Sequence, residues 1–218
     1  MISHHPSPEV LADCARGALN AGATLVVAAH IDLCAGCREE VGLWEHVGGV
    51  VLQDEIPASL SESALQNALN RLDRQTHVAE KFPPRRLPGY LDRFVVPQSL
   101  RSQDVGRRLW VTPNIWFAPV AARTPDSGRT YLMYARPNTK LSLHTHAGRE
   151  FTTVLHGAFR DGLGLFGPGD FAETDDDILH APTVTGDMDC LCLISAEAPM
   201  RLTNPIARAI QVLTGTFY

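Results

Sequence analysis

Several residue patterns that define large classes of protein are missing from this sequence. Only two of its 218 residues are lysines, Lys81 and Lys140, and neither lies in a glycine-rich loop of the kind that binds nucleotide phosphates. The Rossmann glycine fingerprint and the Gly-x-Ser-x-Gly elbow are absent as well. The sequence therefore excludes ATP or GTP binding through a P-loop.

Long apolar segments are also missing. No run approaches the roughly 18 apolar residues that a membrane span needs. The first residues, Met1 to His5, lack the basic and apolar regions of a signal peptide. We therefore expect a cytoplasmic protein without a membrane partner, in which reducing conditions make the five cysteines candidates for metal or redox chemistry rather than structural disulfides.

The charge balance is weakly acidic, with 24 acidic and 19 basic side chains and a formal net charge of −5. Proteins that bind nucleic acid gain much of their affinity from lysines and arginines that neutralise phosphates. We therefore expect no direct DNA binding.

The first part of the chain has the apolar spacing of short helices. Four helices are predicted, and they begin near Ser7, Ala23, Cys37 and the capping box Ser59-x-x-Glu62. A proline- and arginine-rich segment without sustained periodicity follows this helical part. We expect an N-terminal four-helix domain over residues 1–76 and a linker over residues 77–106.

The second part, residues 107–218, has short β-prone runs separated by glycine- and proline-containing turns. The predicted strands include Ile115 to Val120, Thr130 to Ala135, Glu150 to Leu155 and Met188 to Ile194. Strands of this spacing predict an antiparallel β-barrel or jelly roll. The whole chain is thus expected to be a multidomain α + β protein.

The helical part contains the motif His30-x3-Cys34-x2-Cys37. Zinc in a structural site takes four Cys or His donors in a tetrahedron. A spacing of four places His30 and Cys34 on one helix face, and Gly36 would let the chain turn so that Cys37 reaches back. The sequence does not decide which of Cys14, His4, His5 and His46 is the fourth donor. In the alternative interpretation, the two motif cysteines are only small core residues.

The β part contains a second group of metal-ligand residues, His144, His146, Glu150 and His180. Residues i and i+2 of a strand share a face, so His144 and His146 point the same way. Three imidazoles and a carboxylate suit a divalent transition metal such as Zn, Fe, Ni or Mn.

Two further patterns leave alternatives open. Cys190 and Cys192 alternate on one strand face, where they are either buried apolar residues or a redox-responsive pair. Leu65, Leu69 and Leu72 form one face of the fourth helix, which is either core or a surface for a partner.

The two motif groups resemble known families. The His30–Cys37 segment is similar to the zinc-binding anti-sigma domain, and this resemblance implies a fourth ligand about 25 residues upstream, at the offset of His5, with His4 adjacent. Residues 107–218 resemble a cupin, with a Pro-x-Gly equivalent at Pro168 and a final histidine farther along than in the commonest pattern. Together they resemble the ChrR family of anti-sigma factors.

That resemblance implies a non-enzymatic bacterial regulator. It would bind and inhibit an extracytoplasmic-function-type sigma factor through zinc-ordered helices and release it under oxidative stress such as singlet oxygen, sensed by the cupin. The alternative is a metal-dependent cupin enzyme, of the dioxygenase or isomerase type, with an accessory zinc domain. Exposed edge strands of the cupin would also allow two copies of the chain to pair as a homodimer.

Overall fold

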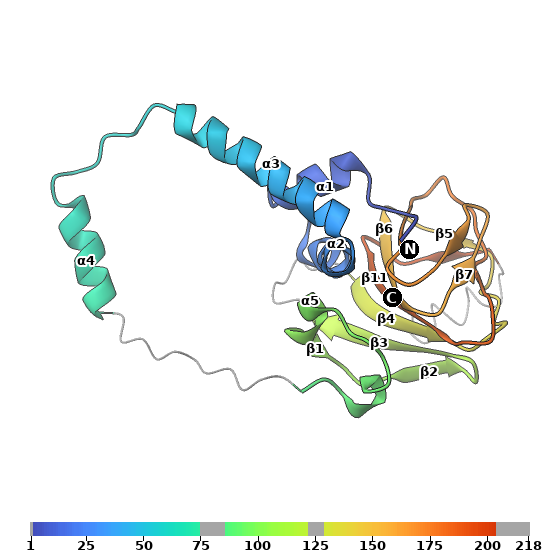
Figure 1. Ribbon diagram of the computed structural model, residues 1–218. Helices are drawn as coiled ribbons and strands as arrows, with labels where there is room; N and C mark the ends of the chain where they lie inside the picture. Colours follow the sequence, from blue (N-terminus) through green and yellow to red (C-terminus); the bar gives the residue numbers. More distant parts are fainter. Residues whose placement is uncertain (1, 75–85, 122–128, 204–218) are drawn as a thin grey trace.

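The computed structural model describes residues 2–74, 86–121 and 129–203, which form a helical part and a β part (Figure 1). This architecture confirms the predicted α + β class. The helices of the N-terminal part are α1 (Pro8–Ala15), α2 (Ala21–Leu33), α3 (Ala35–Asp54) and α4 (Ala64–Arg74). None of the described helices combines the length and the apolar character that a membrane span needs.

Local capping explains where the first helices begin. The Ser7 hydroxyl accepts a hydrogen bond from the Val10 N–H, and Pro8 occupies the first turn of α1, where its missing N–H costs nothing. Asn20 caps α2 by accepting from the Ala23 N–H at 2.9 Å. The predicted capping box is wrong in one respect, because α4 begins only at Ala64, beyond both Ser59 and Glu62.

The β part is built around one large antiparallel sheet. Its strand order is β1-β3-β4-β11-β6-β9, and β2 pairs with β3. The strands are β1 (Asp104–Val105), β2 (Leu109–Thr112), β3 (Ile115–Ala121), β4 (Arg129–Ala135), β6 (Glu150–His156), β9 (Phe171–Thr174) and β11 (Cys190–Ala196). The four predicted strands are therefore confirmed as β3, β4, β6 and β11.

Shorter strands close the opposite wall over the inner face of the large sheet. β10 (Thr183–Val184), β7 (Phe159–Arg160) and β8 (Leu165–Phe166) form one small sheet, and β12 (Arg201–Leu202) pairs with β5 (His144–Thr145). Side chains from both walls make an inner apolar core that includes Phe117, Val154, Phe166 and Ile194. This two-walled arrangement is the predicted jelly-roll type of fold.

Helix α2 packs on the outer face of the large sheet, against β6 and β11. Val26 and Val27 are completely buried there, and the Thr153 hydroxyl of β6 donates to the Val26 carbonyl at 2.8 Å. α2 is apolar over most of its circumference, as expected for a helix whose other sides are covered by α1, α3 and α5. The helical part and the β part therefore share one hydrophobic core.

The described part of the segment predicted as a linker is structured. It contains a 3₁₀ helix, η1 (Gly89–Leu91), and the short helix α5 (Gln98–Arg101), whose Leu91 and Leu100 are buried in the shared core. Most of the proline- and arginine-rich stretch lies outside the described residues. The domain boundaries at residues 76 and 107 stay predictions.

The shared core predicts a large effect for a substitution at its centre. Leu193 on β11 is completely buried, so Leu193→Ala removes apolar contacts and leaves a cavity that costs about 2–5 kcal/mol of unfolding free energy. Urea unfolding followed by circular dichroism measures this loss. Leu109→Ala, at an exposed leucine of β2, is the matched control and should change stability by less than about 0.5 kcal/mol. Equal midpoints for the two variants would contradict the packing.

Candidate metal centres

Three segments of the chain bring a cluster of two histidines and two cysteines together at the end of α2. His5 precedes α1, His30 lies in the last turn of α2, Cys34 joins α2 to α3, and Cys37 lies in the first turn of α3. One donor atom from each residue lies within 4.8 Å of all the others. The sequence motif and the histidine implied by the family resemblance therefore meet at one point.

The turn that brings the two cysteines together differs from the prediction. Cys34 adopts an extended conformation and serves as both the C-cap of α2 and the N-cap of α3. Gly36 already lies inside α3, so it does not make the turn. A single extended residue between two helices is enough to change the direction of the chain and to aim Cys34 and Cys37 at the same point.

The donor atoms of this cluster are spaced as ligands of one tetrahedral zinc ion. Cys37 Sγ lies 3.3 Å from His30 Nε2 and 3.4 Å from His5 Nδ1, and Cys34 Sγ lies 3.5 Å from His5 Nδ1. Zinc bonds of about 2.3 Å to sulfur and 2.0–2.1 Å to nitrogen put neighbouring ligands about 3.5 Å apart. Burial raises the pKa of Cys37 to about 12, so a cation is needed to stabilise its thiolate.

The structure separates His5 from the other candidates for the fourth donor. His4 turns away, with its Nδ1 3.4 Å from an Asp170 oxygen and its ring 4.3 Å from the Phe166 ring. Cys14 packs against the apolar core, and His46 is exposed on α3. His5 is the residue within coordinating reach.

A second cluster lies in the β part. His144, His146 and His180 each offer a nitrogen within 4.8 Å of the other two, and all three are buried. Paired backbone hydrogen bonds of 3.0 Å between His144 and His180 hold two of them together. The Nε2 atoms of His146 and His180 are 3.1 Å apart, a separation typical of two ligands on one metal ion.

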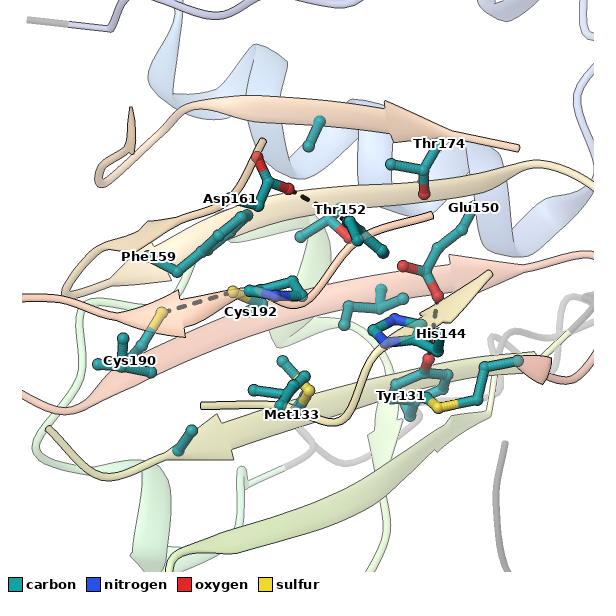
Figure 2. Close-up of a pocket in the computed structure, with 18 residues that line it drawn as sticks. Tyr131, Met133, His144, Glu150, Thr152, Phe159, Asp161, Thr174, Cys190 and Cys192 are labelled. Carbon is teal, nitrogen blue, oxygen red and sulfur yellow. Dashed lines mark hydrogen bonds and ion pairs between the residues drawn. The ribbon is translucent and has the colours of Figure 1, made fainter. Parts of the chain in front are cut away.

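Glu150, the fourth predicted ligand, lies beside this cluster. A carboxylate oxygen is 3.4 Å from His146 Nδ1, and the Tyr131 hydroxyl donates to it at 3.3 Å. Glu150 is outside the group whose donor atoms all lie within 4.8 Å of one another, so the described geometry defines a three-histidine cluster with an adjacent carboxyl. Figure 2 shows Tyr131, His144 and Glu150 together at one end of the cavity.

Burial controls the protonation of this second centre. It lowers the pKa of His144 to about 4 and that of His146 to about 3, so both imidazoles are neutral near pH 7 and can bind a metal. Burial also raises the pKa of Glu150 to about 8. A divalent cation would offset this effect because it stabilises the carboxylate, so the donor set fits a transition metal.

Two hydrogen-bond acceptors orient the histidines and were not identified from the sequence. The Ser142 carbonyl lies 2.7 Å from His144 Nδ1, and Asp161 Oδ2 lies 3.2 Å from His180 Nδ1. Both contacts leave the Nε2 atoms free for a metal. Asp161 stands in an Asp-Gly dipeptide, and its second oxygen caps the turn by accepting from the Leu163 N–H, which is the role that the sequence pattern indicates.

The predicted redox pair lines the cavity beside this centre. Cys190 and Cys192 are buried, with their sulfurs 3.7 Å apart, at the opposite end of the cavity from Glu150 (Figure 2). The hydrogen bond with Cys190 and burial raise the pKa of Cys192, which keeps the thiol protonated. The common face is as expected, and the redox role stays a prediction.

The fold and the two clusters define a class: a helical Cys/His domain joined to a cupin with its own histidine cluster. Residues 104–199 match the family model of the ChrR cupin-like domain. The chain is 33% identical over 214 residues to the anti-sigma-E factor ChrR of Cereibacter sphaeroides, covering 96% of this chain and 97% of that relative. The chain therefore belongs to the ChrR family of anti-sigma factors.

A solved structure has the same arrangement. The crystal structure of Rhodobacter sphaeroides SigE in complex with the anti-sigma factor ChrR matches with a TM-score of 0.71 and 29% sequence identity. The match covers 90% of this chain and 99% of that chain. The similarity thus extends over both parts of the molecule.

Metal analysis of variants tests the two centres separately. We expect Cys34→Ala combined with Cys37→Ala to lose one equivalent of zinc, because two of four donors are removed. Cys14→Ala, at a cysteine outside the cluster, is the matched control and should keep the wild-type zinc content. His144→Ala should lose the metal of the histidine cluster only. A double cysteine variant with unchanged zinc would contradict the assignment.

Proposed function

We propose that this protein is an anti-sigma factor that binds and inhibits an extracytoplasmic-function-type sigma factor and releases it in response to an oxidative signal. The observation that carries the proposal is the apolar surface that α3 and α4 leave exposed. Family membership and the SigE complex of the similar protein support the same partner class. The protein would act in the cytoplasm, without contacting DNA itself.

Helix α3 has an apolar face that nothing in the described chain covers. It extends away from the body of the molecule, and Cys37 in its first turn is its one buried residue (Figure 1). Its exposed large apolar side chains recur at helical spacing: Leu43, Trp44, Val47, Val50 and Val51. A patch of this kind is typical of a protein–protein interface.

Helix α4 presents a second apolar stripe. Leu65, Leu69 and Leu72 are all exposed at the spacing of one helix face, and the helix stands apart from the rest of the molecule (Figure 1). The described structure therefore argues against the core interpretation of these leucines. We propose that α3 and α4 clasp the sigma factor between their apolar faces.

Zinc has a structural role in this proposal. It would join the segment before α1 to the α2–α3 junction through His5, His30, Cys34 and Cys37, and so fix the angle at which α3 leaves the body. A helical part that exposes so much apolar surface gains stability from its metal and its partner rather than from its own core.

The β part would receive the signal. Its histidines and Glu150 would hold a divalent transition metal such as Zn, Fe, Ni or Mn. Cys190 and Cys192, which line the same cavity, would be thiols that the signal could oxidise. The signal can act only if it changes the free energies of the sigma-bound and free states differently.

An enzymatic cupin is the less favoured function. The cavity beside the histidines has a volume of about 40 Å³, room for a few water molecules, whereas metabolite pockets usually occupy several hundred cubic ångströms. A dioxygenase or isomerase would also leave the apolar faces of α3 and α4 without a role.

Binding to a sigma factor is tested by pull-down after co-expression with the extracytoplasmic-function-type sigma factors of the same organism. Leu65→Ser, Leu69→Ser and Leu72→Ser combined should weaken capture by roughly tenfold or more, because the apolar contacts to the partner are lost. Leu109→Ser with Met188→Ser, at exposed apolar residues of the β part, is the matched control and should bind as the wild type does. If no sigma factor is captured by the wild-type protein, the proposed function is wrong.

Signal sensing is tested with the pre-formed complex. His144→Ala should still bind the sigma factor, because α3 and α4 are unchanged, yet release less of it after exposure to singlet oxygen or a peroxide. Release is measured by gel filtration before and after treatment. If this variant releases as much sigma factor as the wild-type protein, the proposed role of the histidine cluster in signalling is wrong.

A further inference from the structure

One loop of the β part, Gly167–Asp170, contacts the zinc cluster of the helical part at His30 and also contacts the residues just before His5. The loop connects β8 to β9, and β9 pairs with β6 in the large sheet. None of its residues is among the proposed zinc ligands, so its contacts lie one shell farther out.

The first contact orients His30. The Gly169 carbonyl lies 2.7 Å from His30 Nδ1, inside the shared core, where His30 is completely buried. A carbonyl only accepts hydrogen bonds, so Nδ1 must carry the proton and Nε2 must be the free nitrogen. Nε2 is the atom that lies 3.3 Å from Cys37 Sγ, so the β part selects the tautomer that can bind the metal.

The second contact holds the residues just before His5. The backbone N–H groups of Ser3 and His4 donate to Asp170 Oδ1 at 2.6 and 3.0 Å, and the Phe171 N–H donates to the His4 carbonyl at 3.0 Å. Asp170 is itself buried and is anchored by the Gly167 N–H, which donates to Oδ2 at 2.8 Å. His5, the next residue along the chain, is thereby held at the cluster.

Gly169 also has a steric reason to be glycine. Its φ of +89° is strained for other residues, and a Cβ there would lie 2.7 Å from Ile2 Cδ1. The N-terminal segment therefore lies directly over the loop backbone, which explains how residues near the chain start reach the zinc cluster.

We propose that the Gly167–Asp170 loop is the second coordination shell of the zinc site, and that it positions His5 and His30 so that the β part sets the zinc affinity of the helical part. This inference rests on the zinc site of the proposed function. Second-shell partners of metal-binding histidines typically contribute 10–100-fold to metal affinity.

The same contacts continue to the histidine cluster of the β part. Asp161, the partner of His180, caps the turn at Gly164, where the His4 ring lies 3.2 Å from the position that a Cβ would occupy. Hydrogen bonds thus join His180, Asp161 and the Gly164 turn, and His4, the neighbour of His5, lies beside that turn. We expect this proximity to couple the two centres, so that a change at His180 alters zinc binding at the cysteines.

The affinity of the cysteine site can be measured alone in the full-length protein. Cobalt(II) bound to thiolates has a charge-transfer absorption that cobalt on histidines lacks, so titration with cobalt and displacement by zinc reports only that site. We expect Asp170→Ala to weaken zinc binding there 10–100-fold. Asp187→Ala, at an exposed aspartate of the β part, is the matched control and should bind zinc as the wild type does.

A second variant covers the case in which Asp170→Ala does not fold. Ser3→Pro removes the N–H that donates to Asp170 and leaves the loop untouched. We expect it to weaken zinc binding at the cysteine site in the same direction. Wild-type affinity in Ser3→Pro, or in a folded Asp170→Ala, would overturn the inference. If the wild-type protein itself gives no thiolate–cobalt band, the proposed zinc site fails instead, so the two failures are distinguishable.

The connection to the second centre has its own measurement. We expect His180→Ala to change the zinc affinity of the cysteine site about fivefold or more, the lower end of typical allosteric coupling, with Leu179→Ala at the exposed neighbour as the control. Equal affinities in the two variants would restrict the role of the loop to positioning and overturn the coupling between the centres.

Discussion

The burial of α2 is the constraint on which the rest of this structure depends. Most of the helix is buried, because the sheet covers one side of it and α1, α3 and α5 pack against the others. Its last turn then places His30 at a fixed point, and the extended residue Cys34 between α2 and α3 directs both thiols to the same place. A cluster of donor atoms at the end of such a helix cannot move without disturbing the core that both parts share.

Both candidate metal centres orient histidines through a hydrogen bond at one ring nitrogen. In each, one ring nitrogen is tied to an acceptor, which leaves the other nitrogen available: the Gly169 carbonyl for His30, the Ser142 carbonyl for His144 and Asp161 for His180. At the zinc cluster, the acceptor comes from the other part of the molecule. In the proposed zinc site, metal binding by the helices and folding of the sheet would therefore be linked through the Gly167–Asp170 loop.

Burial divides the helices according to their roles. α2 is almost wholly buried and carries the scaffold, whereas α3 and α4 expose leucines, valines and a tryptophan that a lone folded domain would bury. The energetic cost of this exposure is offset when a partner covers the surface. The proposed sigma-factor surface and the metal-dependent scaffold are thus two consequences of one helical part too small to bury its own apolar residues.

The sequence by itself determined the class of fold, four helices, the four main strands and every residue of the two clusters except His5. It could do so because helical and strand periodicities and the His/Cys spacings are local properties of the chain. The choice of His5 over His4 was implied by the family resemblance, and it stays a prediction that agrees with the packing of His4 on Phe166 and Asp170. The second-shell roles of Asp161 and Gly169 were decided by the tertiary structure. They depend on contacts between residues that are 19 and 139 positions apart in the sequence, which no local pattern encodes.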